Sequence, residues 1–399
     1  MERERVLRYI DQIILFCFCV LAIFLPIAHT ESIRAFSLGI PTGLWIIKAI
    51  LCRRFLFVRT PVDLPILLFT LIAGLSVVTA VDPRYSLQEF IGEWILGICL
   101  FYLVANNVRP EQMKYILGAL LIGNIIMVTY GVFDFFQDGG LILHPKVRAA
   151  SLHSGVGTFS TYLVTVIPYL LIALFFIPKN LKFFMLGILL GLNFFAFALT
   201  YSRGSLVAIG MLLLLTGWRY LPRKVFVILI VSLGMGGAFH ANERIVAYYH
   251  RFTVPPPVGF TPDSYHGRWI LTKFTLEKIK ENPFQMNGLG RGAFPKKFQD
   301  FVRKYEGAKM WHAHNTFLNL AIQTGLQGLF LFCFLLYRML KYCRERERSG
   351  GSSVIRYFSL GTFLMIITFF VRNLSDDFFI DDSALLFWFL SGIVFARKI

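Results

Sequence analysis

The stretch WHAHNTFLNL, residues 311–320, stands where a long hydrophilic segment ends and an apolar helix begins. It carries two histidines, His312 and His314, just before that helix. Histidine takes up and returns a proton near neutral pH, and the water-facing start of a helix offers free N–H groups and a partial positive charge to an anion. The stretch therefore predicts a proton acceptor beside an anion site at a membrane surface. The alternative is that His314 or Asn315 simply caps the helix.

The composition indicates a membrane protein. The chain of 399 residues is 56% hydrophobic and has a mean hydropathy of +0.63, and a soluble domain with so many apolar residues could not cover itself with polar surface. The first apolar segment, about 9–29, is long enough to span and lacks a small-residue cleavage site after it, so we expect a retained span rather than a signal peptide. No cysteine falls in 240–313, so we expect neither a disulfide nor a metal cluster there.

Apolar stretches predict an all-α polytopic fold with about twelve transmembrane helices, since each is near the ~20 residues that cross ~30 Å of hydrocarbon. Two of them, 204–218 and 383–397, are short and we expect them to tilt less or to span only partly. The domains predicted are spans one to nine in 1–239, an extramembrane domain in 240–313, and spans ten to twelve in 314–399. The twelve stretches are about 9–29, 33–51, 62–80, 90–107, 113–134, 155–178, 182–200, 204–218, 224–240, 314–341, 354–373 and 383–397.

The net charge of +17 could suggest nucleic acid, but its distribution argues for a membrane topology. With the N-terminus in the cytoplasm, 22 Lys and Arg residues fall at the inside ends of the spans and 6 in the short outside loops. Short loops rich in Lys and Arg stay in the cytoplasm. We therefore expect a multi-pass membrane protein with both termini cytoplasmic, segment 240–313 outside, and no nucleic acid partner.

The segment 240–313 contains two amphipathic patterns. The first predicts a helix that is capped by Asp263 or Ser264 and runs to about Glu281. The second predicts a basic helix from Phe294 to Tyr305 with Gly307 as its C-cap, lying on headgroups or packed on the bundle. Between them, the glycine-rich residues 287–292 are a weak signal for a phosphate cradle, because no strand precedes them.

An acidic loop follows the eleventh apolar stretch, in residues 373–383. Two adjacent pairs of carboxylates can bind a divalent metal, but more often they mark a water-facing loop, and we favour that interpretation. No metal site is therefore expected at Asp376, Asp377, Asp381 and Asp382.

Three features point to one site at the outer face. They are His314, Arg203 in the turn Tyr201-Ser202-Arg203-Gly204, and Arg268 in His266-Gly267-Arg268-Trp269. Each arginine could merely pair with lipid phosphate or stabilise an interfacial helix. Together, two arginines could hold a pyrophosphate leaving group while a histidine takes a proton from an attacking hydroxyl. No nucleotide motif is present, so we expect no cofactor, and the energy would come from the substrate's own phosphoester.

The spacing from His314-Asn315 through nine residues to Gly325 and then Gly328 resembles the motif of the O-antigen ligase and polymerase superfamily of bacterial inner membranes. The predicted topology, with a long periplasmic loop between spans nine and ten, is similar to that of its lipid A-core:O-antigen ligases over nearly the whole chain. The resemblance implies a glycosyltransferase of the GT-C type. The implied donor is a polysaccharide on undecaprenyl pyrophosphate, and the implied acceptor is a sugar hydroxyl of lipid A-core at the periplasmic face.

The resemblance also implies roles for particular residues. The essential histidine of the family corresponds to His314, and its two essential arginines correspond to Arg203 and Arg268. The implied reaction is a metal-independent, inverting displacement. Candidates of second rank are His312, Asn315 and Arg84.

Three other functions remain open at this stage. An O-antigen polymerase would use the same donor but extend the chain on its undecaprenyl carrier. A protein O-oligosaccharyltransferase tends to carry a C-terminal extension, whereas this sequence stops at Ile399. A polysaccharide-lipid transporter would place charges at the bilayer midplane, but here they gather at the outer ends of the spans, which favours a surface active site.

Overall fold

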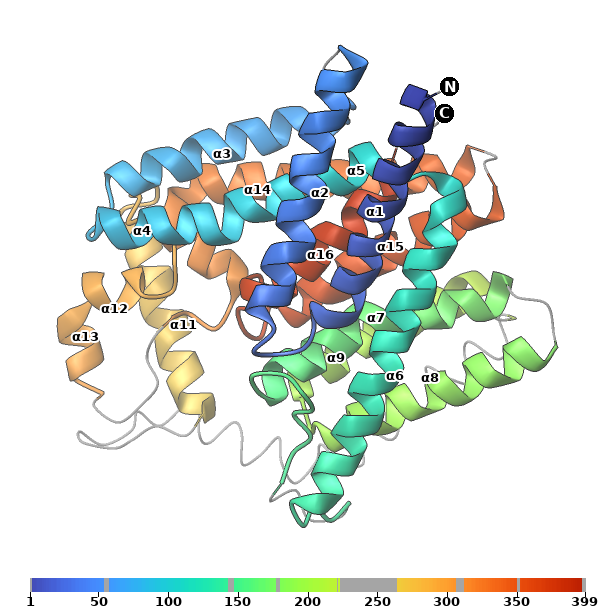
Figure 1. The fold of residues 1–399 in the computed structure, drawn as a ribbon. Helices are drawn as coiled ribbons and strands as arrows, with labels where there is room; N and C mark the ends of the chain where they lie inside the picture. Colours follow the sequence, from blue (N-terminus) through green and yellow to red (C-terminus); the bar gives the residue numbers. More distant parts are fainter. Residues whose placement is uncertain are drawn as a thin grey trace.

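The computed structural model describes residues 2–53, 57–142, 147–176, 180–220, 222, 264–305, 312–349 and 352–396. All of its regular elements are helices (Figure 1). Within this described part, eight helices are long and apolar enough to cross a membrane. The chain is thus an all-α polytopic membrane protein, as its composition predicts.

The helices of the first half follow the predicted stretches closely. The unit α4–η1–α5 is one continuous rod that contains a π-helical segment, η1, and η2 leads directly into α6. The apolar stretch at 224–240 lies outside the described residues. The bounds are α1 Glu2–Phe24, α2 Glu31–Cys52, α3 Asp63–Val78, α4 Pro83–Glu89, η1 Phe90–Ile95, α5 Leu96–Asn107, η2 Pro110–Gln112, α6 Met113–Gln137, α7 Val156–Phe176, α8 Leu181–Leu199 and α9 Arg203–Tyr220.

The second half contributes three helices to the bundle and three to the segment before it. The bundle helices are α14 Thr316–Arg348, α15 Ser353–Arg372 and α16 Asp381–Val394. The others are α11 Ser264–Glu281, α12 Ala293–Lys297 and α13 Gln299–Arg303, which lie together at one corner of the molecule (Figure 1).

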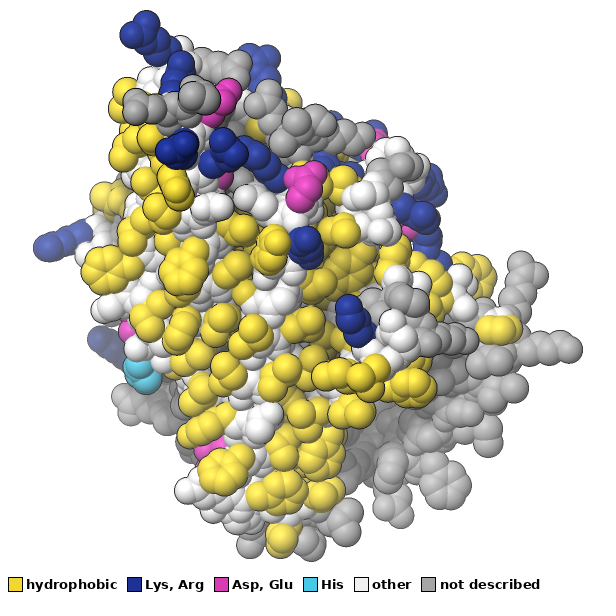
Figure 2. Space-filling model, turned by 45° about the vertical axis from the view of Figure 1, so that its right-hand side comes forward, with side chains coloured by type: hydrophobic (Ala, Val, Ile, Leu, Met, Phe, Trp, Pro, Cys, Tyr) yellow, Lys and Arg dark blue, Asp and Glu magenta, His cyan; other side chains and the backbone are white. Residues whose placement is uncertain are grey.

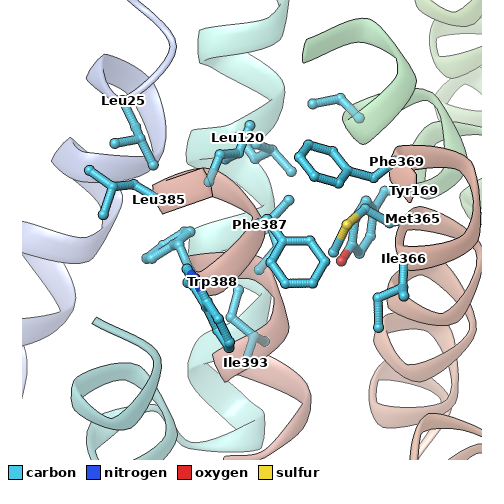
Figure 3. Close-up of a cluster of buried hydrophobic side chains, with 14 of the residues drawn as sticks. Leu25, Leu120, Tyr169, Met365, Ile366, Phe369, Leu385, Phe387, Trp388 and Ile393 are labelled. Carbon is cyan, nitrogen blue, oxygen red and sulfur yellow. The ribbon is translucent and has the colours of Figure 1, made fainter. Parts of the chain in front are cut away.

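The core of the bundle forms around α16. This helix has 14 residues, and every residue from Ala384 to Val394 is buried. A helix that is apolar all round is stable only when other helices surround it. Here α5, α7 and α15 pack against it. Figure 3 shows Phe387 and Trp388 of α16 among side chains of α6, α7 and α15, and the rings of Phe387 and Phe369 lie 5.4 Å apart.

The outside of the bundle is apolar where lipid would lie. Figure 2 shows hydrophobic side chains over the middle of one face and Lys and Arg side chains gathered toward its top. The most hydrophobic window of α2 is only 11% buried, and that of α8 only 28%. Exposed apolar belts of this size are unfavourable in water and favourable in a bilayer.

Helix α14 is broken at Gly325, whose backbone has φ 71° and ψ 172°. The break frees backbone groups that must be hydrogen-bonded in an apolar medium. Residues 283–288, which follow α11, supply the partners. Pro283 O accepts from Leu326 N at 2.9 Å, and Gln323 O accepts from the N–H groups of Asn287 and Gly288 at 3.0 and 3.1 Å. The first nine residues of α14 therefore form a separate half-helix that is locked to the segment after α11.

The two amphipathic predictions had different outcomes. The first is confirmed by α11, which begins at Ser264 and ends at Glu281. The second is wrong as a single helix, because the chain turns at Phe298 (φ −116°, ψ 47°) between α12 and α13. The Gln299 side chain bonds to Lys296 O at 3.3 Å, the carbonyl that a continuous helix would pair with a backbone N–H. Gly307, predicted as the C-cap, lies outside the described residues.

The conformation of Gly325 gives a direct test of the break. We expect Gly325→Ala to lower the free energy of unfolding by about 1–3 kcal/mol, because this backbone region is open almost only to glycine and a Cβ would lie 2.4 Å from Gln327 Nε2. The control is Gly187→Ala in α8, where a Cβ meets nothing within 4 Å. Thermal unfolding in detergent measures both, and equal melting temperatures for the two variants would contradict the strained break.

Candidate active site

His314 is held just outside the start of α14. Asn315 is the N-cap, and its Oδ1 accepts from Phe317 N and Leu318 N at 2.9 and 3.1 Å. The backbone of His314 is left-handed, with φ 47°, a strained conformation for a residue with a side chain. Because Asn315 does the capping, the imidazole of His314 is available for chemistry.

Asp376 in the α15–α16 loop, residues 373–380, holds the imidazole in place. Its Oδ1 lies 3.0 Å from His314 Nδ1. Burial favours a higher pKa for the Asp376 carboxyl, but the hydrogen bond to His314 and the charges of Arg268 and Arg372 outweigh it, and the pKa is lowered. A carboxylate at Nδ1 fixes the ring so that Nε2 is left for a substrate.

His312 stabilises the backbone conformation of His314 through a hydrogen bond. It is 7% exposed, and its Nδ1 accepts the backbone N–H of His314 at 3.0 Å. Burial first, and then the charges of His314 and Arg291, lower the pKa of His312 to about 3. His312 is therefore neutral at physiological pH and stabilises the unusual backbone of His314 rather than taking a proton itself.

Arg268 contacts the α15–α16 loop, and Arg203 precedes a residue that does. Arg268 of α11 donates through Nη1 to Ser375 O at 2.7 Å, and its Nη2 lies 3.3 Å from Asp376 Oδ2. Arg203 is the first residue of α9. The next residue, Gly204, touches the loop so closely that a Cβ there would lie 1.9 Å from Ser375 Oγ. The loop thus contacts His314, Arg268 and the residue after Arg203, which come from three distant parts of the chain.

Two further arginines belong to the same cluster. Arg372 ends α15 and donates to Ser375 Oγ at 2.9 Å. Arg148 donates to Thr200 O at 2.8 Å, and its pKa is lowered by burial and then by the charges of Arg203 and Arg268. The charges of these arginines act on one another, so an anion close to them would be stabilised. In the sequence, Arg148 and Arg372 served only to set the topology.

The acidic loop is water-facing only in part. Asp381 is exposed as predicted, whereas Asp376 and Asp377 turn inward toward arginines and the start of α14. Asp377 is buried and accepts from Thr316 Oγ1 at 2.6 Å and from Asn319 Nδ2 at 2.5 Å. Asp382 forms an ion pair with Arg34.

Arg84 does not join this cluster. It is exposed at the start of α4, and no hydrogen bond or ion pair that the structure describes connects it to His314. Its neighbour Asp82 instead pairs with Lys296 at 2.5 Å. The sequence could not reveal this, because the outer loop that carries Arg84 is near the site in topology but faces α12.

A divalent cation is a poor fit to the one group of metal-type ligands found among the described residues. Ligand atoms of His312, His314 and Asp376 lie within 4.8 Å of one another. However, His312 Nδ1 already accepts a backbone N–H, Arg268 takes the second oxygen of Asp376, and the arginine cluster repels cations. The charge of the site suits an anionic ligand better.

The buried His312 predicts a pH dependence of stability. The unfolded chain binds a proton at His312 below about pH 6.5, whereas the folded chain resists it down to a pKa of about 3. Stability should therefore fall as the pH drops through this window, and by about 2 kcal/mol from this group between pH 7 and 5. His312→Asn, which keeps an acceptor near Nδ1, should lose correspondingly less in thermal unfolding at the two pH values.

The exposed His29 supplies the control, since its left-handed backbone (φ 60°) also accepts asparagine. His29→Asn should show the full wild-type pH dependence. If the His312→Asn and His29→Asn variants lost the same stability on acidification, the neutral, buried state of His312 would be refuted.

Comparison with known proteins finds similarity to polysaccharide ligases. Residues 188–333 match a family model described as O-antigen ligase, and this segment holds Arg203, Arg268 and His314. A Rickettsia bellii protein named "Putative polysaccharide ligase" is 25% identical over 338 residues, which cover 80% of this chain and 77% of that protein. A protein of the same description from Rickettsia typhi is 25% identical over 286 residues, covering 69% of this chain and 67% of its own. These matches show that the chain is similar to O-antigen ligases over the segment that carries the clustered residues, and to polysaccharide ligases over most of its length.

Proposed function

We propose that this protein is an O-antigen ligase. It would transfer a polysaccharide from undecaprenyl pyrophosphate to a sugar hydroxyl of lipid A-core, at the periplasmic face of the bacterial inner membrane and with both termini cytoplasmic. The observation that carries the proposal is the single loop, residues 373–380, that brings His314 onto Asp376 and the arginine cluster around it.

The arginines would bind the donor. A guanidinium group can hold two phosphate oxygens at once, and Arg203, Arg268, Arg148 and Arg372 provide a charge that suits a pyrophosphate. As the sugar–phosphate bond breaks, negative charge grows on the leaving oxygen, and fixed cations stabilise that charge more than they stabilise the ground state. The reaction then needs no cofactor and no metal.

His314 would act on the acceptor. Its Nε2 takes the proton of the acceptor hydroxyl while that oxygen attacks the anomeric carbon from the side opposite the pyrophosphate. One carbon–oxygen bond forms as the other breaks, so the anomeric configuration inverts and the proton remains on His314. Asp376, hydrogen-bonded at Nδ1, stabilises the imidazolium that results.

The nearest alternative is an O-antigen polymerase, which would use the same arginines and histidine with a different acceptor. A transporter is disfavoured, because the arginines and histidines cluster at loops and helix ends rather than midway along the spans. The family description and the names of the relatives favour the ligase.

Substitution of His314 tests the proposed base. In liposomes that contain the polysaccharide-lipid donor, lipid A-core and a chelator, the wild type should modify lipid A-core, and His314→Ala should be slower by about 100-fold or more. The control, His29→Ala at an exposed position, should transfer normally. Near-normal turnover by His314→Ala would contradict the role of base. Longer chains that stay on the undecaprenyl carrier would instead indicate a polymerase, and activity lost to the chelator and restored by Mg²⁺ would refute the metal-independent reaction.

Substitution of Arg268 tests donor binding. Lysine cannot reproduce the two-pronged contact that Arg268 makes with Ser375 and Asp376. We expect Arg268→Lys to raise the KM for the donor by about tenfold or more, as for the loss of one charge-assisted contact. Arg303→Lys, at an exposed residue of α13, is the matched control. An unchanged donor KM in Arg268→Lys would argue against a phosphate role.

A further inference from the structure

A polar pocket, separate from the arginine cluster, adjoins the first turn of α14. It is a cavity of about 50 Å³ between the π-helical η1, residues 289–291, the first half of α14 and the α15–α16 loop. Its polar lining includes Glu89, Glu93, Arg291, Asn319 and Asp377, and aromatic rings such as Trp94 close its sides. The cavity can hold a water molecule or the hydroxymethyl end of a sugar, and its mouth leaves room for the ring outside. None of the roles proposed above uses this pocket.

The carboxyl groups of this pocket lie in an unusual place. Glu93 belongs to η1, inside the apolar span that runs from Pro83 to Asn107, and Glu89 ends α4 one turn before it. An ionisable residue within a span is costly and normally serves a function. A π-helical turn, which displaces the backbone register, also recurs at functional sites.

Arg291 gives an independent sign of a ligand. Its Nε and Nη2 are buried and have no hydrogen-bond partner, and Nε lies 3.7 Å from Asp377 Oδ2, beyond a hydrogen bond. Buried N–H groups that lack an acceptor are costly. Beside a polar cavity, they call for an oxygen atom from water or from a ligand.

The pocket lies next to the arginine cluster, because consecutive residues of the α15–α16 loop belong to the two sites. Two consecutive residues divide the site: Asp376 faces His314 and Arg268, and Asp377 faces Asn319 and Arg291. Carboxylates repel a pyrophosphate but accept hydrogen bonds from hydroxyl groups. Charge therefore separates the arginine side, which suits the anionic donor, from a carboxyl side, which suits a neutral saccharide.

We propose that this cavity is the acceptor subsite, in which Glu93 and Arg291 hold a hydroxyl or hydroxymethyl group of a neutral acceptor sugar. A neighbouring hydroxyl of the same sugar would then lie against His314 Nε2. The aromatic rings would cover the apolar face of the sugar. This proposal rests on the proposed function and adds to it the class of acceptor unit, a sugar without phosphate at the reacting end.

The test is a kinetic comparison of Glu93→Gln and Arg291→Gln in the liposome assay. We expect each to raise the KM for the acceptor tenfold or more, and to leave kcat and the KM for the donor within threefold of wild type. Glu111→Gln, at an exposed residue of η2, is the control and should match wild type. Glu93→Asp, which keeps the carboxyl group, should restore part of the affinity. An unchanged acceptor KM in folded Glu93→Gln and Arg291→Gln, or a rise in the donor KM instead, would overturn the subsite.

A binding measurement without donor separates this proposal from the proposed function. Core oligosaccharide freed from lipid A is titrated into wild type, Glu93→Gln, Arg291→Gln and Glu111→Gln, and its Kd is measured. Weaker binding in the first two variants, with Glu111→Gln close to wild type, supports the subsite. Equal Kd values in all four overturn it, even where the wild type transfers polysaccharide. A wild type that binds the oligosaccharide at the subsite but never transfers would instead refute the proposed reaction.

Discussion

The site depends on the way in which the break in α14 is closed. A helix interrupted inside an apolar bundle exposes N–H and C=O groups that neither lipid nor hydrophobic side chains can bond. Here residues 283–288 bond to both sides of Gly325, and Asn287 Nδ2 adds a bond of 2.7 Å to Ile322 O. The half-helix that begins after His314 is therefore held by residues 283–288, which lie between Arg268 and Arg291 in the chain.

The α15–α16 loop completes the arrangement by burying carboxylates where cations converge. A buried carboxylate is stable only when it is paired and hydrogen-bonded, and Asp376 and Asp377 each have such partners. Their pairing orients His314 on one side and ties down the first turn of α14 on the other. The strained backbone of His314 persists because Asn315, His312 and Asp376 all restrain it.

Local sequence patterns predicted most of the helices and half of the site. Apolar length fixed the spans that the structure describes, and Ser264 and Asn315 marked helix starts because short polar side chains cap free N–H groups. The same patterns failed at Phe298, where helical spacing continues through a turn in the chain. They also failed in the acidic loop, because a run of aspartates looks identical whether water or arginines surround it.

What the sequence determined by itself is the membrane class, the helical fold and the candidates His314, Arg203 and Arg268, because hydrophobic length and a spaced motif are properties of the chain. What only the tertiary structure decided is which charges meet. Arg148, Arg372 and Asp376 have no local signature that separates them from topology-setting or solvent-facing residues, and Arg84 has none that excludes it. Electrostatic interactions act through space at a few ångströms, so their partners are defined only once helices distant in the sequence have packed together.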